Sequence, residues 1–192
     1  MFPPDEIRRR YEEIRAAAPG VTVVAATKYV SLEDMGRLAE AGVEVVGENR
    51  AQDLERKHAA YGDAFRWHFI GHLQSNKVKV INRTCELVHS LASQSAAQRL
   101  EIPALVEVNL SGEPTKSGVP PEELEPLLGP HVRGLMTMPP LGGDSRAYFR
   151  RLRELALEHG LAELSMGTTQ DWRVAVEEGA TLIRVGSVLF SE

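Results

Sequence analysis

The sequence predicts a single-domain α/β fold, a closed (β/α)8 barrel of the TIM type. Eight short apolar runs alternate along the chain with polar segments of helical periodicity. Strict alternation implies parallel strands joined by right-handed crossovers, and eight such units close a barrel. The chain has 192 residues, whereas such barrels typically need roughly 250. We therefore expect short loops, and an open, doubly wound sheet with fewer strands is the alternative.

The N-terminal segment predicts an amphipathic helix over residues 4–18. Ile7, Tyr11 and Ile14 lie at helical spacing on one face, and Pro19-Gly20 ends the pattern. We expect residues 1–20 to pack against the outside of the barrel. No Ser/Gly-rich linker interrupts the chain, so residues 1–192 are expected to form one domain.

Eight apolar runs predict the strands. They are VTVVAATK at 21–28, VEVVGEN at 43–49, WHFIGH at 67–72, CELVHSL at 85–91, ALVEVNL at 104–110, VRGLMTMP at 132–139, AELSMG at 162–167 and TLIRVGSVLF at 181–190. Helical periodicity is clearest at 31–42, 147–160 and 171–179, and each of these segments ends in glycine. Because the strands are mostly apolar, both faces of the sheet are expected to be covered.

Composition excludes several classes of function. The net charge is -5 and basic residues are scattered, which argues against nucleic-acid binding. Cys85 is the single cysteine, so the chain forms no intrachain disulfide and no cysteine-cluster metal site. No apolar run is long enough to span a membrane, and the start of the chain lacks a signal-peptide pattern. We therefore expect a cytoplasmic protein.

Lys28 ends the first apolar run and is the most unusual candidate residue. Side chains alternate along a strand, so Lys28 shares a face with Thr22, Val24 and Ala26. If that face points inward, Lys28 lies at the barrel mouth, where such barrels place their active sites. Burying an ammonium there is costly, and a neutral lysine amine forms a Schiff base with an aldehyde. The alternative is a lysine that extends from a strand end into solvent.

A phosphate site is predicted where the seventh run meets the next helix. Barrels of this type frequently bind phosphate with the loops after strands seven and eight and a helix N-terminus. Ser165, Gly167, Thr168 and Thr169 lie at this point, and Gly186 follows in the eighth run. The alternative is that Thr168 or Thr169 only caps the helix.

Arg184 lies within the last apolar run, on the same face as Gly186. An inward-pointing guanidinium needs a partner, and a phosphate or a ring nitrogen of a ligand would provide one. An ion pair with Glu48 or Glu107 is the alternative. His68 is a further candidate, for ring stacking or hydrogen bonding.

Met136 is most simply a residue that fills the core, although it lies at the end of the sixth run. We keep it among the candidate cofactor contacts. No metal site is predicted, because His68 and His72 would lie about 13 Å apart along one strand.

Seven ordered stretches, spread over almost the entire chain, carry a resemblance to a known family. They are AATKYVS at 25–31, GENRAQD at 47–53, WHFIGHLQSNKVK at 67–79, VEVNLSGEPTKSGV at 106–119, RGLMTMP at 133–139, LSMGTTQDWRVAVEEGAT at 164–181 and IRVGSVLF at 183–190. Together they resemble the pyridoxal 5′-phosphate (PLP) homeostasis proteins, also called the YggS or proline synthase co-transcribed family.

The resemblance implies a fold-type III PLP barrel like the N-terminal domain of alanine racemase, with Lys28 as the Schiff-base lysine. It also implies a set of residues around the cofactor: Asn49, the turn of Ser165, Met166, Gly167 and Thr168, and Arg184 with Gly186. One departure is visible after the seventh strand. The family usually has Met-Gly-Met-Ser-x-Asp there, and this chain has Met-Gly-Thr-Thr-Gln-Asp at 166–171.

The resemblance implies a carrier or regulator of intracellular PLP with no established enzyme activity. Apo forms of PLP enzymes are its expected recipients. A PLP-dependent racemase or decarboxylase is the alternative, but such racemases draw one base from a second domain, which this length does not accommodate. That lack also favours a monomer. A barrel that binds another phosphorylated ligand without PLP is a third hypothesis.

Overall fold

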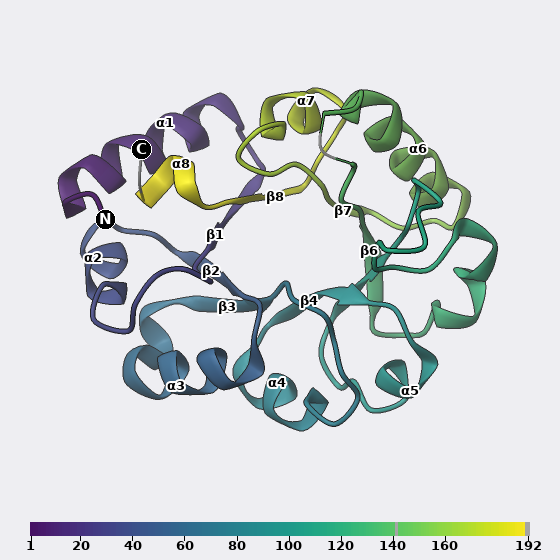
Figure 1. The fold of residues 1–192 in the computed structure, drawn as a ribbon, viewed down its shortest axis with the longest axis horizontal. Coiled ribbons are helices and arrows are strands. Elements are labelled where there is room, and N and C mark those ends of the chain that lie inside the picture. Colours follow the sequence, from purple (N-terminus) through teal and green to yellow (C-terminus); the bar gives the residue numbers. More distant parts are fainter. Residues whose placement is uncertain (141, 191–192) are drawn as a thin grey trace.

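The computed structural model describes residues 1–140 and 142–190 and shows a closed barrel of eight parallel strands (Figure 1). The strands are β1 (Thr22–Ala26), β2 (Val45–Glu48), β3 (Arg66–Phe69), β4 (Leu87–Leu91), β5 (Ala104–Glu107), β6 (Val132–Met136), β7 (Glu163–Ser165) and β8 (Leu182–Val185). Each strand pairs with the next in the chain, and β8 pairs with β1. The predicted barrel is confirmed, and the open sheet is wrong.

Helices form the outer ring around the strands (Figure 1). They are α1 (Pro4–Ala17), α2 (Met35–Glu40), α3 (Ala51–Tyr61), α4 (Val78–Thr84), α5 (Gln94–Ala97), α6 (Ser145–Glu158), α7 (Trp172–Glu177) and α8 (Ser187–Phe190). Short 3-10 turns at Gly62–Ala64, Pro121–Glu123 and Glu125–Leu127 complete the connections. The last two turns connect β5 to β6, which shows how a short chain completes eight units.

The N-terminal helix lies beside the C-terminal end of the described chain (Figure 1). Ile7, Tyr11 and Ile14 are buried, as their spacing predicts. The Phe2 N–H donates to the Phe190 carbonyl at 3.0 Å, which ties the start of the chain to α8. Residues 1–18 therefore pack against the outside of the barrel, next to the closing strands.

Side-chain alternation divides the core into two parts. Inward-facing side chains fill the barrel interior: Val24, Val45, Leu87, Leu105, Met136 and Leu182. Outward-facing side chains pack against the helices in a larger cluster that includes Val23, Val46, Phe69 and Ile183. The alternation follows from the two-residue period of a strand, and it places every second residue of each strand on the axis that leads to the candidate site.

Gly134 gives a test of the packing between β6 and β7. A Cβ on Gly134 would lie 1.9 Å from the Glu163 carbonyl oxygen, a backbone atom that cannot move without disturbing the sheet. We expect Gly134→Ala to lower the free energy of unfolding by about 3 kcal/mol, measured by urea denaturation. Gly129→Ala is the matched control, because a Cβ there meets no atom within 4 Å. Equal stability of the two variants would contradict this account.

Candidate functional site

A cavity of about 500 Å³ opens at the C-terminal ends of the strands, and we call it the upper cavity. Its volume falls within the range of roughly 300–1,000 Å³ that is usual for small-molecule sites. Five predicted site residues line it: Lys28, Asn49, Thr168, Arg184 and Gly186. They come from the ends of β1, β2, β7 and β8, so barrel closure brings together residues from both ends of the chain.

Lys28 lies at the rim of the upper cavity and is exposed to solvent. The expectation that Lys28 ends β1 and is buried at its mouth is wrong, because β1 ends at Ala26 and the chain turns at Lys28. Its Nζ lies 4.8 Å from the centre of the Tyr29 ring. Lys28 forms no ion pair with any described residue, so its amine is available to a ligand in the cavity.

A buried ion pair holds the backbone just before Lys28. The Lys57 ammonium donates to the Glu48 carboxylate at 2.5 Å and to the Thr27 carbonyl at 2.8 Å. The Thr27 hydroxyl donates to the same carboxylate at 2.6 Å. Lys57 comes from α3 and is 2% exposed, whereas the neighbouring Lys28 is exposed. The structure thus separates a structural lysine from an accessible one.

Sequence reasoning missed Lys57, although a signal was present. Ala51, Leu54 and Lys57 follow one another at three-residue spacing, and all three are buried on the inner face of α3. A lysine on the apolar face of a helix needs a buried partner, and Glu48 at the end of β2 provides one.

Arg184 is a buried cation at the base of the upper cavity. Its guanidinium donates to the Thr137 carbonyl at 3.1 Å and to the Ser165 hydroxyl. Burial lowers the pKa of Arg184 to about 10, so the group remains protonated at neutral pH. The alternative ion pairs with Glu48 and Glu107 are not formed in the described part of the chain. A charge desolvated in this way favours a ligand that accepts hydrogen bonds.

The turn after β7 has its own internal hydrogen bonds. The Asp171 carboxylate accepts from both the N–H and the hydroxyl of Thr168, at 2.7 and 3.1 Å. The Gly186 N–H donates to the Thr169 hydroxyl at 3.1 Å, which links the ends of β7 and β8. Thr168 lines the upper cavity together with Thr169, Gln170 and Ser187, but Asp171 engages both of its donors.

Gly167 has a structural reason to be glycine. Its φ is +90°, and a Cβ would lie 2.5 Å from the Ala175 Cβ and 2.9 Å from the Trp172 Cα. Only glycine combines this backbone conformation with so close an approach to α7. The turn therefore stays close to α7.

The predicted site residues Asn49, Met136 and Met166 lie in three different parts of the structure. Asn49 lines the upper cavity, and its buried Oδ1 has no hydrogen-bond partner in the described structure. The Met136 side chain lies in the barrel interior. The Met166 side chain packs outside the barrel in the helix-facing core. Neither Met136 nor Met166 lines the upper cavity, and the Met166 N–H donates to the Leu182 carbonyl at 3.1 Å.

His68 is not brought to the upper cavity but lies within the barrel. Its Nδ1 is 2.9 Å from the His89 Nε2, and the His89 Nδ1 is 2.7 Å from the Ser165 Oγ. Since Arg184 donates to Ser165, a continuous hydrogen-bonded chain runs from His68 to the base of the upper cavity. His89 was missed, although it shares the inward face of β4 with Leu87.

Burial keeps the imidazoles of His68 and His89 neutral. Desolvation and then the charge of Arg66 lower the pKa of His68 to about 3. Desolvation, followed by electrostatic interaction with His68 and with the charge of Arg184, holds the pKa of His89 well below its usual value. Each ring therefore has one donor nitrogen and one acceptor nitrogen.

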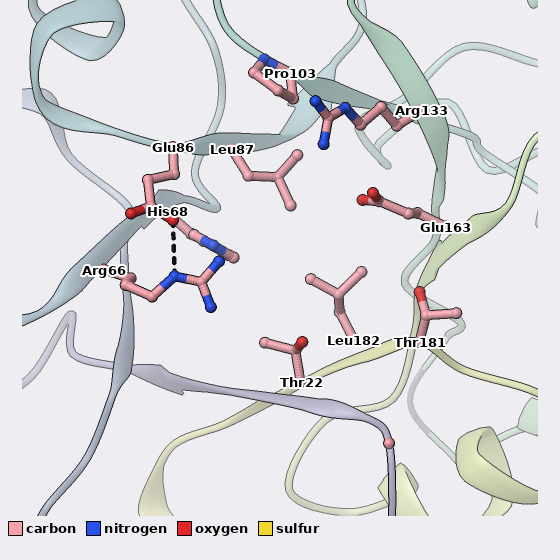
Figure 2. A pocket seen from close by; sticks show the side chains of 11 residues that line it. Thr22, Arg66, His68, Glu86, Leu87, Pro103, Arg133, Glu163, Thr181 and Leu182 are labelled. Atoms are coloured by element: carbon pink, nitrogen blue, oxygen red, sulfur yellow. Dashed lines mark hydrogen bonds and ion pairs between the residues drawn. The ribbon is translucent and has the colours of Figure 1, made fainter.

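A second cavity, of about 460 Å³, opens at the N-terminal ends of the strands, and we call it the lower cavity (Figure 2). His68 lines it together with Leu87 and Leu182. Charged side chains surround it, and Arg66 donates to Glu86 at 2.8 Å. The chain from His68 to Arg184 thus connects the two cavities through the interior of the barrel.

Other classes of site find little support in the described residues. Within residues 1–140 and 142–190, no three His, Cys, Asp or Glu side chains are grouped to hold a metal ion. In the same part of the chain, no helix has the length and hydropathy needed to cross a bilayer. Burial raises the pKa of the Cys85 thiol to about 12, so it is not a nucleophile at neutral pH.

The neutral histidines predict a loss of stability in acid. The pKa of His68 is about 3 in the fold and about 6.5 in an unfolded chain, so the unfolded state binds more protons between these values. Stability is complete above about pH 6.5 and falls below it. From pH 7 to pH 5 we expect His68 alone to lower the free energy of unfolding by about 2 kcal/mol.

Urea denaturation at both pH values measures this effect in wild type, His68→Gln and His159→Gln. His159 is exposed at the end of α6, so its variant should keep the wild-type loss. His68→Gln should show a smaller loss. An identical pH dependence in all three proteins would refute the burial argument.

Comparison with known proteins identifies relatives for this arrangement. No family model matches the chain. It is 41% identical to the pyridoxal phosphate homeostasis protein of Aquifex aeolicus (strain VF5), over 88% of this chain and 86% of the relative. The solved structure of PipY from Synechococcus elongatus PCC7942 with PLP bound matches with a TM-score of 0.87 at 33% identity, covering 96% of this chain and 100% of that chain. Alanine racemase from Corynebacterium glutamicum matches with a TM-score of 0.73 at 16% identity, over 97% of this chain and 60% of that one, which shows a common fold.

Proposed function

The chain belongs to the pyridoxal phosphate homeostasis protein family, and from this premise we propose that it binds PLP in the upper cavity as a carrier and regulator of the cofactor. The single observation that carries the proposal is that the accessible amine of Lys28 and the buried cation of Arg184 line one cavity. Support comes from the PipY structure, which contains PLP.

The residues of the upper cavity fit the chemistry of PLP. Asn49 has a buried oxygen without a partner, and Arg184 is a buried cation without a carboxylate partner among the described residues. The turn at Ser165, Met166, Gly167 and Thr168 adjoins Gly186 at the ends of β7 and β8. We propose that Thr169, Gln170 and Ser187 join these residues in holding the phosphate, since they line the cavity.

PLP supplies an aldehyde that condenses with a primary amine, and this is the chemistry it brings when bound. We assign the Schiff-base amine to Lys28. Lys57 is the other lysine near the site, but its nitrogen is buried between a carboxylate and a carbonyl and is not accessible to an aldehyde. Arg184 would donate to an acceptor atom and keep that atom unprotonated, since its own pKa stays near 10.

Carriage, rather than turnover, agrees with the small number of acid–base groups at the upper cavity. Lys28, Tyr29, Asp34 and Arg184 are the titratable side chains that line it among the described residues. Tyr29 is 90% exposed, so nothing fixes its hydroxyl against a ligand. A racemase needs a positioned base on each face of the reacting carbon. We therefore propose no enzyme activity, with apo PLP enzymes as recipients and a monomer in the cytoplasm.

Lys28 provides the decisive test of cofactor attachment. Purified protein mixed with PLP should develop a visible absorption band, and borohydride should then add one reduced cofactor to the intact mass, located on Lys28 by peptide mapping. Lys28→Ala should abolish both signals. Lys116→Ala is the matched control, because Lys116 lies outside the lining of both cavities. Colourless wild-type protein without a mass increase would defeat the proposal.

The enzyme alternative is tested on the same loaded protein. Amino-acid chirality and carbon dioxide release are followed while transfer of PLP to an apo enzyme is measured. Turnover above ~1 s⁻¹ would overturn the carrier function, whereas transfer without turnover would support it.

A further inference from the structure

A buried polar side chain of β3, His68, lines the lower cavity. His68 is 2% exposed, and its Nδ1 is engaged by His89. The one hydrogen bond of its ring to a described residue is made by Nδ1, and the His68 side chain lines the lower cavity. The second ring nitrogen, Nε2, is therefore suited to contact a polar group inside the cavity.

The rim of the lower cavity carries one positive and one negative side chain, Arg133 and Glu163, that do not pair with each other among the described residues. Arg66 is neutralised by Glu86. Arg133 on β6 and Glu163 on β7 form no ion pair within residues 1–140 and 142–190, although their strands are adjacent. Figure 2 shows both side chains pointing toward the same space. A simple anion in this cavity would be repelled by the Glu163 carboxylate, and a simple cation would be repelled by the Arg133 guanidinium.

The base of the lower cavity is apolar. Leu87 and Leu182 are 7% and 5% exposed and line it together with Pro103. A volume of about 460 Å³ lies within the usual range for small-molecule sites. A matching ligand therefore has one carboxylate, one ammonium group and a short aliphatic side chain.

We propose that the lower cavity binds a small zwitterion of α-amino-acid size, and that its occupant sets the direction of the hydrogen bonds from His68 to Ser165. Arg133 would hold the carboxylate and Glu163 the ammonium group, while the aliphatic part lies on Leu87 and Leu182. The group that faces the His68 Nε2 then decides whether that nitrogen donates or accepts.

The hydrogen bonds from His68 through His89 to Ser165 all take the same direction, since each neutral imidazole has one donor and one acceptor nitrogen. If the His68 Nε2 donates to the ligand, its Nδ1 accepts from His89, and the His89 Nδ1 accepts from the Ser165 hydroxyl. If the His68 Nε2 accepts, every bond reverses and Ser165 accepts from both His89 and Arg184. In that case the serine proton is released from His89, beside the Arg184 guanidinium that lines the upper cavity.

This coupling would link the lower cavity to the cofactor, a consequence that rests on the function proposed above. A serine hydroxyl that is free to donate adds a hydrogen-bond donor beside Arg184, and one that is engaged by His89 does not. The ligand of the lower cavity would thus change how the upper cavity holds its own ligand without contacting it.

The test uses the full-length protein without PLP and three probes: L-valine, isovalerate, which lacks the amine, and isobutylamine, which lacks the carboxylate. Imidazole 15N resonances report the tautomers of His68 and His89 directly. We expect L-valine to shift both residues in a saturable way and to bind about tenfold more tightly than either partial analogue. Because no PLP is present, the result is independent of the Lys28 experiment.

Variants at the rim locate the binding site. Arg133→Gln and Glu163→Gln should each weaken L-valine binding about tenfold, and both side chains lie at the surface, so the fold should be kept. Arg99→Gln, outside both cavities, should bind as wild type does. Absence of a saturable shift, equal binding of isovalerate, or unchanged binding by both rim variants would overturn the site. A shift confined to His68 would overturn the coupling.

Discussion

Pairing of β1 with β8 is the interaction on which both the fold and the site depend. The pairing is parallel and runs from Thr22 opposite Leu182 to Ala25 opposite Val185. It joins the first strand of the chain to the last, and it places the turn of Lys28 beside Gly186. Without closure, the amine and the buried guanidinium of Arg184 would belong to opposite edges of an open sheet. The cavity exists because the barrel has no edge.

Closure also decides how polar groups inside the barrel are satisfied. Inward-facing side chains are largely buried, so a polar residue there needs a partner on another strand. His68, His89, Ser165 and Arg184 come from β3, β4, β7 and β8 and satisfy one another in sequence. The carbonyl of Thr137 completes the set. One arrangement therefore stabilises the interior and fixes the orientation of Arg184.

The sequence predicts the barrel well because strand alternation and helical spacing are local patterns. The positions of Ile7 on α1 and Leu152 on α6 follow from spacing alone, and both residues are buried. The residue at which a strand ends depends more on contacts with distant parts of the chain. β1 ends before Lys28 because Thr27 is held by the Gly47 carbonyl and by Lys57 from a later helix. Such contacts span 20 to 30 residues and leave no periodic signal in the segment itself.

The candidate site also combines residues that local sequence patterns predict with residues whose placement depends on distant contacts. Lys28, Arg184 and Gly186 were predicted from their positions in or at the end of apolar runs, and Asn49 from the family resemblance. The structure places all four along one cavity. His68, inside the third apolar run, was grouped with them for ring stacking or hydrogen bonding, yet it borders the opposite cavity.

Depth along the barrel axis depends on strand register, which the sequence of one strand does not contain. His68 pairs with Gly47 on β2 and Leu87 on β4, and this register sets its height in the barrel. The residue that leads toward the cofactor side from His68 is His89, which was not predicted. Residues at the ends of predicted strands therefore identify the lining of the upper cavity. The contacts that connect the upper and lower cavities depend on strand register and are visible only in the assembled barrel.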